Sequence, residues 1–181
     1  EAFNLLENLL RWTRNQNGKT KIYATLFNLT PVARQVVSLF SAIANAKEIE
    51  LINRIEGKFD IFADEDMIKT VLRNLISNAI KFTYTGGQVE LSLADSGDYW
   101  TIYVKDNGKG IPKDLQAHLL KSDEYITTYG THNEKGSGLG LILCRDFIRM
   151  NKGKLHFYSQ EGIGTTFYFT IPKASSSAEA V

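Results

Sequence analysis

The stretch Asn74-Leu-Ile-Ser-Asn-Ala-Ile-Lys81 decides the fold, because it joins an apolar helical stripe to polar side chains one turn apart. Two glycine-containing stretches follow it at intervals of about 25 residues: Asp106-Asn-Gly-Lys-Gly110 and Gly136-Ser-Gly-Leu-Gly-Leu141. Each stretch is weak evidence when taken alone. In this order and at this spacing, they predict a pocket for a nucleoside triphosphate and its magnesium ion.

Asn74, Asn78 and Lys81 are spaced i, i+4 and i+7, so they share one face of a helix expected over residues 64–82. Magnesium prefers oxygen ligands, and an asparagine carbonyl supplies one without adding charge. Lys81 can then meet a phosphate as a point charge. A solvated polar face is the alternative for this spacing.

Asp106 directly follows a strand expected over residues 99–105. A carboxylate at the end of a strand can be held half-buried, where it accepts a hydrogen bond from an exocyclic amine such as N6 of adenine. Gly108 and Gly110 allow a close backbone approach or a positive φ. A plain hairpin turn is the alternative, because Asp-Asn-Gly is a good turn sequence.

Gly136, Gly138 and Gly140 lie where a helix expected over residues 139–150 begins. Successive glycines expose N–H groups to an anion, the helix N-terminus adds partial positive charge, and Lys135 adds a full charge. The spacing matches neither the dinucleotide fingerprint nor the phosphate loop of P-loop proteins. A flexible hinge is the alternative for this stretch.

Composition narrows the possible functions. The 181 residues are 43% hydrophobic and 23% charged, which is typical of one globular domain with a sizeable core. A net charge of +1 argues against a nucleic-acid-binding surface, so phosphate recognition must be local. The single cysteine, Cys144, excludes an internal disulfide and is expected to be a small core residue. No apolar run reaches the roughly 18–20 residues that span a bilayer.

The rest of the chain predicts a mixed sheet covered on one face by helices, because hairpins and helices alternate irregularly. The pair Thr30-Pro31 predicts an N-cap followed by proline at the first position of a helix. Strands are expected at 22–29, 48–53, 58–63, 87–94, 99–105, 154–159 and 165–171, and helices at 30–46, 64–82, 139–150 and, briefly, after Pro112.

Three segments fall outside this pattern. Residues 1–17 form an expected helix whose wide apolar stripe needs partners, so we expect the end of a bundle helix and a chain that is part of a larger protein. Residues 121–137 are polar and lack periodicity, which is typical of a functional loop. The tail at 174–181 has the composition of a linker.

Over residues 20–173, the chain resembles the ATP-binding catalytic domain of bacterial two-component sensor histidine kinases, with the hybrid type as one option. Residues 74–83 match the asparagine box of this family, 106–111 its first glycine box, and 136–141 its second. The resemblance implies an α+β fold of the Bergerat type. This is a two-layer α/β sandwich in which about three helices cover one face of a mixed five-stranded sheet.

The resemblance also implies roles for individual residues. Asn78 would be the magnesium ligand, assisted by Asn74, and Asn78 and Lys81 would serve the reaction. Asp106 would read adenine with the support of Thr165 through water, and residues 121–137 would be the ATP lid. Tyr84 would lie beside the nucleotide or pack locally. The other expected ATP-binding residues are Gly108, Gly110, Ile111, Thr131, Lys135, Gly136, Ser137, Gly138, Leu139, Gly140 and Leu141.

The function that the resemblance implies is transfer of the γ-phosphate of Mg-ATP to a histidine, for relay to the receiver domain of a response regulator. Residues 1–19 would end the dimerisation and histidine-phosphotransfer hairpin of a homodimeric parent protein, 20–173 would be the catalytic domain, and 174–181 the tail. We expect a cytoplasmic domain without direct membrane contact, in a parent protein anchored in the inner membrane.

Two positions depart from the family pattern. The phospho-acceptor histidine is absent, because none of His118, His132 and His156 lies in the expected helical motif with a following acidic residue and a proline. The segment before the expected lid reads His118-Leu-Leu120 where family members often carry phenylalanines, so the packing of the lid stays open.

Gyrase-type topoisomerases, mismatch-repair ATPases and heat-shock chaperones share this ATP fold but hydrolyse ATP. They activate water with a glutamate one turn before the metal-binding asparagine, where this chain has Asn74, and an amide cannot act as a general base. Transfer to a protein acceptor is therefore favoured. A non-catalytic ATP-gated interaction module and a GHKL-type ATPase are the alternatives. Anti-sigma serine kinases also share the fold, and the apolar helix at 1–17 favours the sensor kinase.

Overall fold

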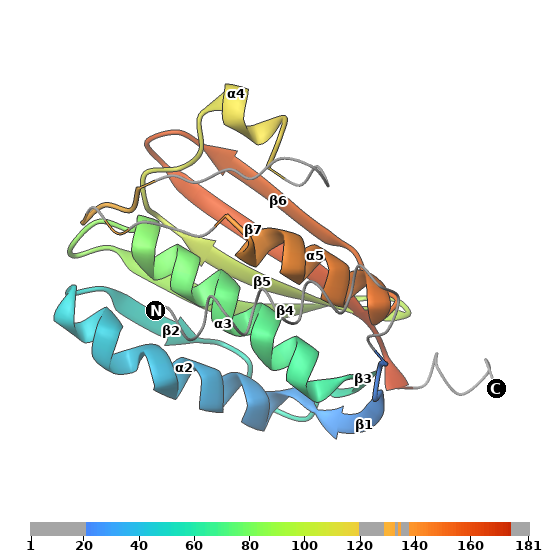
Figure 1. Ribbon diagram of the computed structural model, residues 1–181. Coiled ribbons are helices and arrows are strands. Elements are labelled where there is room, and N and C mark those ends of the chain that lie inside the picture. Colours follow the sequence, from blue (N-terminus) through green and yellow to red (C-terminus); the bar gives the residue numbers. More distant parts are fainter. Residues whose placement is uncertain (1–20, 120–128, 133, 135–137, 175–181) are drawn as a thin grey trace.

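A mixed five-stranded sheet with the strand order β2-β4-β5-β7-β6 forms one layer of the molecule, and helices form the other (Figure 1). The computed structural model describes residues 21–119, 129–132, 134 and 138–174. Its elements are β1 (Thr25–Asn28), α2 (Leu29–Ala46), β2 (Glu50–Asn53), β3 (Asp60–Ala63), α3 (Glu65–Phe82), β4 (Gln88–Ser96), β5 (Tyr99–Asp106), α4 (Lys113–Gln116), α5 (Gly140–Met150), β6 (Leu155–Gln160) and β7 (Gly164–Pro172).

The predicted α+β sandwich is confirmed. Strand β2 runs parallel to β4, whereas β4–β5, β5–β7 and β7–β6 are antiparallel pairs. Helices α2, α3 and α5 lie over the same face of this sheet (Figure 1). Strands β1 and β3 form a separate antiparallel pair beside it. The helix expected at 1–17 and the tail beyond Ala174 lie outside the described residues.

Helix α3 is the central helix of its layer, because its apolar stripe is buried against β4 and β5 on one side and α5 on another. Ile68, Leu72 and Leu75 are completely buried on this helix, and each such side chain stabilises the fold by about 1.5–3 kcal/mol. Asp64 caps the N-terminus as predicted, since its side chain accepts a hydrogen bond from the Met67 N–H.

Alternation along β5 decides which side chains point from the sheet toward the helices. Ile102 and Val104 are buried in the core, and the two-residue period of a strand puts Asp106 on the same face. The corresponding series in β7 contains Phe167 and Phe169. A carboxylate at an inward-facing position is therefore enclosed between the sheet and α3, and this position creates the site described below.

Cys144 is a core residue, as predicted. Its side chain is 1% exposed within α5, beside α3. Burial raises the pKa of its thiol far above the ordinary value, so the thiolate does not form at neutral pH. Among the described residues, no helix is both long enough and apolar enough to cross a membrane.

The predicted N-cap of α2 was wrong. The cap is Asn28, which ends β1, and its Oδ1 accepts hydrogen bonds from the Thr30 and Phe59 N–H groups at 3.1 Å each. The Thr30 hydroxyl instead donates to the Gly57 carbonyl. Asparagine outcompetes threonine here because its longer side chain satisfies a helix donor and also holds the segment before β3.

We expect Asn28→Ala to lower the free energy of unfolding by about 1–3 kcal/mol, because two backbone N–H groups lose their acceptor. Urea unfolding of the purified chain measures this change. Gln35→Ala, at an exposed position of α2, is the matched control and should change the stability by less than about 0.5 kcal/mol. Equal stability of the two variants would contradict the assignment of Asn28 as the cap.

Candidate functional site

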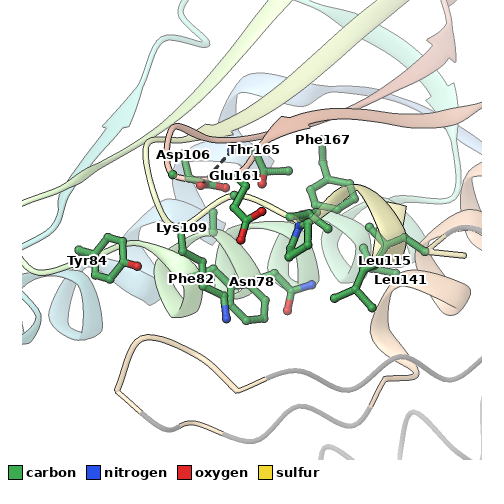
Figure 2. Close-up of a pocket in the computed structure, with 16 residues that line it drawn as sticks. Asn78, Phe82, Tyr84, Asp106, Lys109, Leu115, Leu141, Glu161, Thr165 and Phe167 are labelled. Carbon is green, nitrogen blue, oxygen red and sulfur yellow. Dashed lines mark hydrogen bonds between the residues drawn. The ribbon is translucent and has the colours of Figure 1, made fainter. Parts of the chain in front are cut away.

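A cavity of about 470 Å³ opens between the C-terminal half of α3, the segment after β5, and the β6–β7 turn (Figure 2). This volume suits a small-molecule ligand. The cavity joins the first two sequence stretches and reaches the third at Leu141. Its apolar wall is made by Ala79, Phe82, Ile111, Pro112, Leu115, Leu119, Leu141 and Phe167, and its polar lining by Asn78, Tyr84, Asp106, Lys109, Glu161 and Thr165.

Asp106 lies at the inner end of the cavity and is only 6% exposed, so it is more deeply buried than the sequence predicts. Its Oδ1 accepts hydrogen bonds from the Gly108 N–H at 2.9 Å and from the Thr165 N–H at 3.2 Å, the second of which is drawn in Figure 2. Burial raises the pKa of Asp106 from 3.8 to about 6, although these two hydrogen bonds act in the opposite direction. The group is therefore a buried carboxylate at neutral pH.

Thr165 supports Asp106 directly through its backbone N–H, and its hydroxyl lies 2.8 Å from the Ser159 hydroxyl. Ser159 is a residue that sequence reasoning missed. Its Oγ also accepts the Ile111 N–H at 2.9 Å, so it ties β6 to the segment after β5. A signal was present, because Ser159 is a polar residue at an inward-facing strand position after Leu155 and Phe157.

The glycines of the Asp106–Gly110 stretch pack the loop against the end of α3 and the end of β6. A Cβ at Gly108 would collide with the Phe82 carbonyl, and the neighbouring Lys109 N–H donates to that carbonyl at 3.0 Å. Gly110 has a φ of +68°, which a residue with a side chain rarely adopts. Gly108 therefore lets the loop meet the end of the helix, and Gly110 lets it pass close to the backbone of Gln160 at the end of β6.

The predicted polar face of α3 divides along its length. Asn78 lines the cavity, whereas Asn74 does not contribute to its described lining. The Asn74 amide donates to the Thr70 carbonyl at 2.9 Å, and its Oδ1 would lie 2.7 Å from a Cβ at Gly140, where α5 begins. Asn74 thus lies at the junction of α3 and α5, one turn away from Asn78.

Two ammonium groups gather at Phe82. The Nζ atoms of Lys81 and Lys109 each lie 4.9 Å from the centroid of its ring. Lys109 also lines the cavity and was missed as a site residue, although it stands inside a stretch that the sequence singles out. Because Phe82 lines the cavity, these two positive charges favour an anionic ligand there.

Among the remaining predicted residues, some line the cavity and others do not. Gly138 and Leu139 lead into α5, which begins at Gly140, while Lys135, Gly136 and Ser137 lie outside the described residues. Tyr84 lines the cavity and is largely exposed. Thr131 is turned to the C-terminal end of α3: its hydroxyl donates to the carbonyl of Thr83, directly after the helix, at 2.8 Å.

A buried carboxylate, an apolar wall and two ammonium groups at the C-terminal end of α3 make a site suited to a nucleotide, in a domain made of helices on a mixed sheet. Residues 63–175 match the family described as "Histidine kinase-, DNA gyrase B-, and HSP90-like ATPase", and the chain belongs to this family. The adaptive-response sensory kinase SasA of Crocosphaera subtropica is 30% identical over 170 residues, which are 93% of this chain and 44% of the relative. The chain thus spans less than half the length of that protein.

Solved structures of histidine kinases share the fold. The catalytic domain of histidine kinase ThkA is 31% identical, with a TM-score of 0.71 over 83% of this chain and 96% of that chain. Full-length ShkA in complex with AMPPNP is 27% identical, with a TM-score of 0.79 over 94% of this chain and 35% of that chain. ThkA in complex with the response regulator protein TrrA is 26% identical, with a TM-score of 0.72 over 96% of this chain and 50% of that chain. The fold is therefore that of histidine kinase catalytic domains.

The raised pKa of Asp106 predicts a pH dependence of stability. The folded protein binds this proton more tightly than the unfolded chain, so the free energy of unfolding should fall as pH rises from about 4 to about 6. Asp106→Asn keeps an oxygen acceptor without the charge. It should remove this fall and raise the free energy of unfolding at pH 8 by about 1–3 kcal/mol.

Urea unfolding of the ligand-free variant and the wild type at pH 4 and pH 8 measures the effect. Asp114→Asn, at an exposed aspartate of α4, is the control and should follow the wild type at both pH values. An Asp106→Asn variant that is less stable than the wild type at pH 8 would show that burying this carboxylate costs no stability.

Proposed function

We propose that this chain binds Mg-ATP in the cavity and transfers the γ-phosphate to a histidine on the dimerisation domain of its own parent protein. The observation that carries the proposal is the buried carboxylate of Asp106 at the inner end of a largely apolar cavity, with Lys81 and Lys109 gathered at Phe82 beside it. A carboxylate at the inner end and ammonium groups at Phe82 fit a ligand with a polar base at one end and phosphates at the other.

The carboxylate suits the exocyclic amine of adenine. Within the described part of the chain, both hydrogen bonds that Asp106 accepts end on Oδ1, so Oδ2 has no protein donor. A ligand N–H group in the cavity would supply the donor that this oxygen lacks. The side chains of Ala79, Ile111 and Leu141 supply apolar surface for the ring of the base.

Asn78 is the proposed magnesium ligand, with Asn74 assisting. Among the described residues, no three His, Cys, Asp or Glu side chains lie together, so a metal cage built from these residues is absent there. A magnesium ion that takes an amide oxygen from the protein and other oxygens from phosphates and water fits such a site. The bound ion would neutralise charge on the phosphates, while Asn78 would hold it beside the cavity.

Lys81 and Lys109 would hold the phosphates. Lys109 lines the cavity, and Lys81 lies outside its lining but holds its ammonium group 4.9 Å from the ring centroid of Phe82, which does line it. Each ammonium group has three N–H donors for phosphate oxygens. The N-terminus of α5 adds partial positive charge, and we assign the Gly136–Leu141 stretch to the same phosphates. The role of these residues in the reaction is to orient the phosphates and balance their charge.

Transfer is favoured over hydrolysis by the chemistry of Asn74. An amide cannot take a proton from water, and this amide donates to the Thr70 carbonyl within its own helix. In transfer to a histidine, the nucleophile is a side chain of the acceptor domain, so the catalytic domain needs no general base of its own. The proposed reaction breaks the bond between the β–γ bridging oxygen and the γ-phosphorus, and forms a bond from phosphorus to an imidazole nitrogen.

We further assign residues 20–173 to the catalytic domain, 1–19 to the end of the dimerisation and phosphotransfer hairpin, and 174–181 to a tail. The proposed partners are the dimerisation domain of a homodimeric parent protein and the receiver domain of a response regulator. The complex of the related ThkA with its response regulator supports the second partner. We propose a cytoplasmic location for the domain, within a parent anchored in the inner membrane.

Calorimetric titration with a non-hydrolysable ATP analogue, with and without magnesium, tests the binding step. We expect magnesium-dependent binding with a dissociation constant in the micromolar to sub-millimolar range, about −5 to −8 kcal/mol. A dimerisation domain supplied as a separate protein then tests transfer from labelled ATP. Binding without transfer favours an ATP-gated interaction module, phosphate release without an acceptor favours an ATPase, and no binding overturns the proposal.

Asn78→Ala should remove the magnesium dependence of nucleotide binding, because the ion loses its ligand from the protein. Titrations of the variant should give the same affinity with magnesium as with a chelator. Ser77→Ala changes the neighbouring exposed residue of α3 and should keep the magnesium dependence of the wild type. A persisting magnesium dependence in Asn78→Ala would exclude Asn78 from the metal site.

A further inference from the structure

Lys47, directly after α2, is a buried lysine that the proposed reaction does not use. Its side chain is 7% exposed. Its Nζ donates to the carbonyls of Ile80 and Lys81 at 3.0 Å each, and to Oε1 of Glu134 at 3.1 Å. An ammonium group has three N–H donors, and three acceptors surround this one. Lys47 thus joins the C-terminal end of α3 to a residue 87 positions later in the chain.

Glu134 belongs to a short segment, residues 129–132 and 134, that we call the anchored turn. Its Oε2 accepts the His132 N–H at 2.8 Å, and its backbone carbonyl accepts the Gly130 N–H at 2.9 Å. The Thr131 N–H donates to the Lys81 carbonyl at 3.1 Å. These bonds close the turn on itself and attach it to the end of α3.

The anchored turn contacts both lysines that flank Phe82. The Tyr129 carbonyl accepts a hydrogen bond from Lys109 Nζ at 2.6 Å. Gly130 packs so closely on Lys81 that a Cβ at this glycine would lie 2.6 Å from Lys81 Cγ. The position of each lysine side chain therefore depends on where the turn is held.

Electrostatics favours this arrangement. The last carbonyls of a helix lack partners within the helix and carry partial negative charge, which suits the Lys47 ammonium group. Burial acts to raise the pKa of Glu134, but hydrogen bonds from its own N–H, from His132 and from Lys47 lower it overall, so its carboxylate stays ionised at neutral pH. The buried lysine thus binds a helix end and a carboxylate at the same time.

We propose that Lys47 and Glu134 are positioning residues of the nucleotide site, which fix the anchored turn on α3 and thereby hold the ammonium groups of Lys81 and Lys109 where they meet a polyphosphate. The inference rests on the proposed binding of ATP in the cavity. It assigns a function to two residues outside the cavity lining, and it predicts that they act on the phosphate part of the ligand and leave the recognition of the base unchanged.

Calorimetric titration of Glu134→Ala with the ATP analogue and with adenosine tests this inference. The Glu134 side chain is 36% exposed, so its removal should leave the fold intact. We expect the affinity for the ATP analogue to fall about tenfold and the affinity for adenosine to change less than about twofold. A variant that binds the analogue as tightly as the wild type does, or that loses both ligands equally, would overturn the inference.

Lys109→Met provides a second test through non-additivity. If Glu134 acts by orienting Lys109 and Lys81, the double variant of Glu134→Ala and Lys109→Met should lose much less free energy of binding for the ATP analogue than the sum of the two single losses. Additive losses would show that the residues act independently and would overturn the inference. Lys47→Met should reproduce the phenotype of Glu134→Ala at temperatures at which both variants are folded.

Lys58→Met is the matched control. Lys58 forms a surface ion pair with Asp60 at 3.1 Å, is 76% exposed, and does not line the cavity, so its loss should leave both affinities unchanged.

The wild type separates the proposed function from this inference. If the wild type binds no ATP analogue, the proposed function fails and this inference fails with it. If it binds and the Glu134 variant binds equally well, only this inference fails.

Discussion

The carbonyl groups at the C-terminal end of α3 control the architecture around the cavity. A helix ends with carbonyls that have no partners inside the helix, and they must be satisfied from elsewhere. Here Ile80 and Lys81 accept hydrogen bonds from Lys47, and Phe82 accepts the Lys109 N–H. The end of one helix therefore joins α2, the segment after β5 and the anchored turn, and each of these carries or orients a residue of the proposed site.

The same site contains a charge that the fold tolerates at a cost. Asp106 occupies a position at which the alternation of β5 calls for an apolar residue, and its neighbours Ile102 and Val104 show what the core accepts there. Two backbone N–H groups reduce the cost of burial without removing it, as the pKa of about 6 indicates. Such a conflict between local packing and chemistry is typical of functional sites.

Much of the fold could be predicted because it depends on local patterns. The apolar stripe of α3 and its cap at Asp64 follow from spacing within a few residues, and the inward direction of Asp106 follows from strand alternation. The roles of Lys47 and Glu134 could not be predicted, because they depend on a contact between residues 87 positions apart. The cap of α2 was assigned to Thr30 because the second function of Asn28, holding the Phe59 N–H, is invisible in the local sequence.

The burial of Cys144 has a practical consequence for work on this chain. The sequence contains one cysteine, and its thiol is enclosed in the core and protonated at neutral pH, so a maleimide reagent should not modify the folded protein. The native chain is in effect a cysteine-free background for surface chemistry. A single thiol introduced on the exposed surface would be the only point of attachment for a fluorophore or a spin label, and its signal would report that position alone.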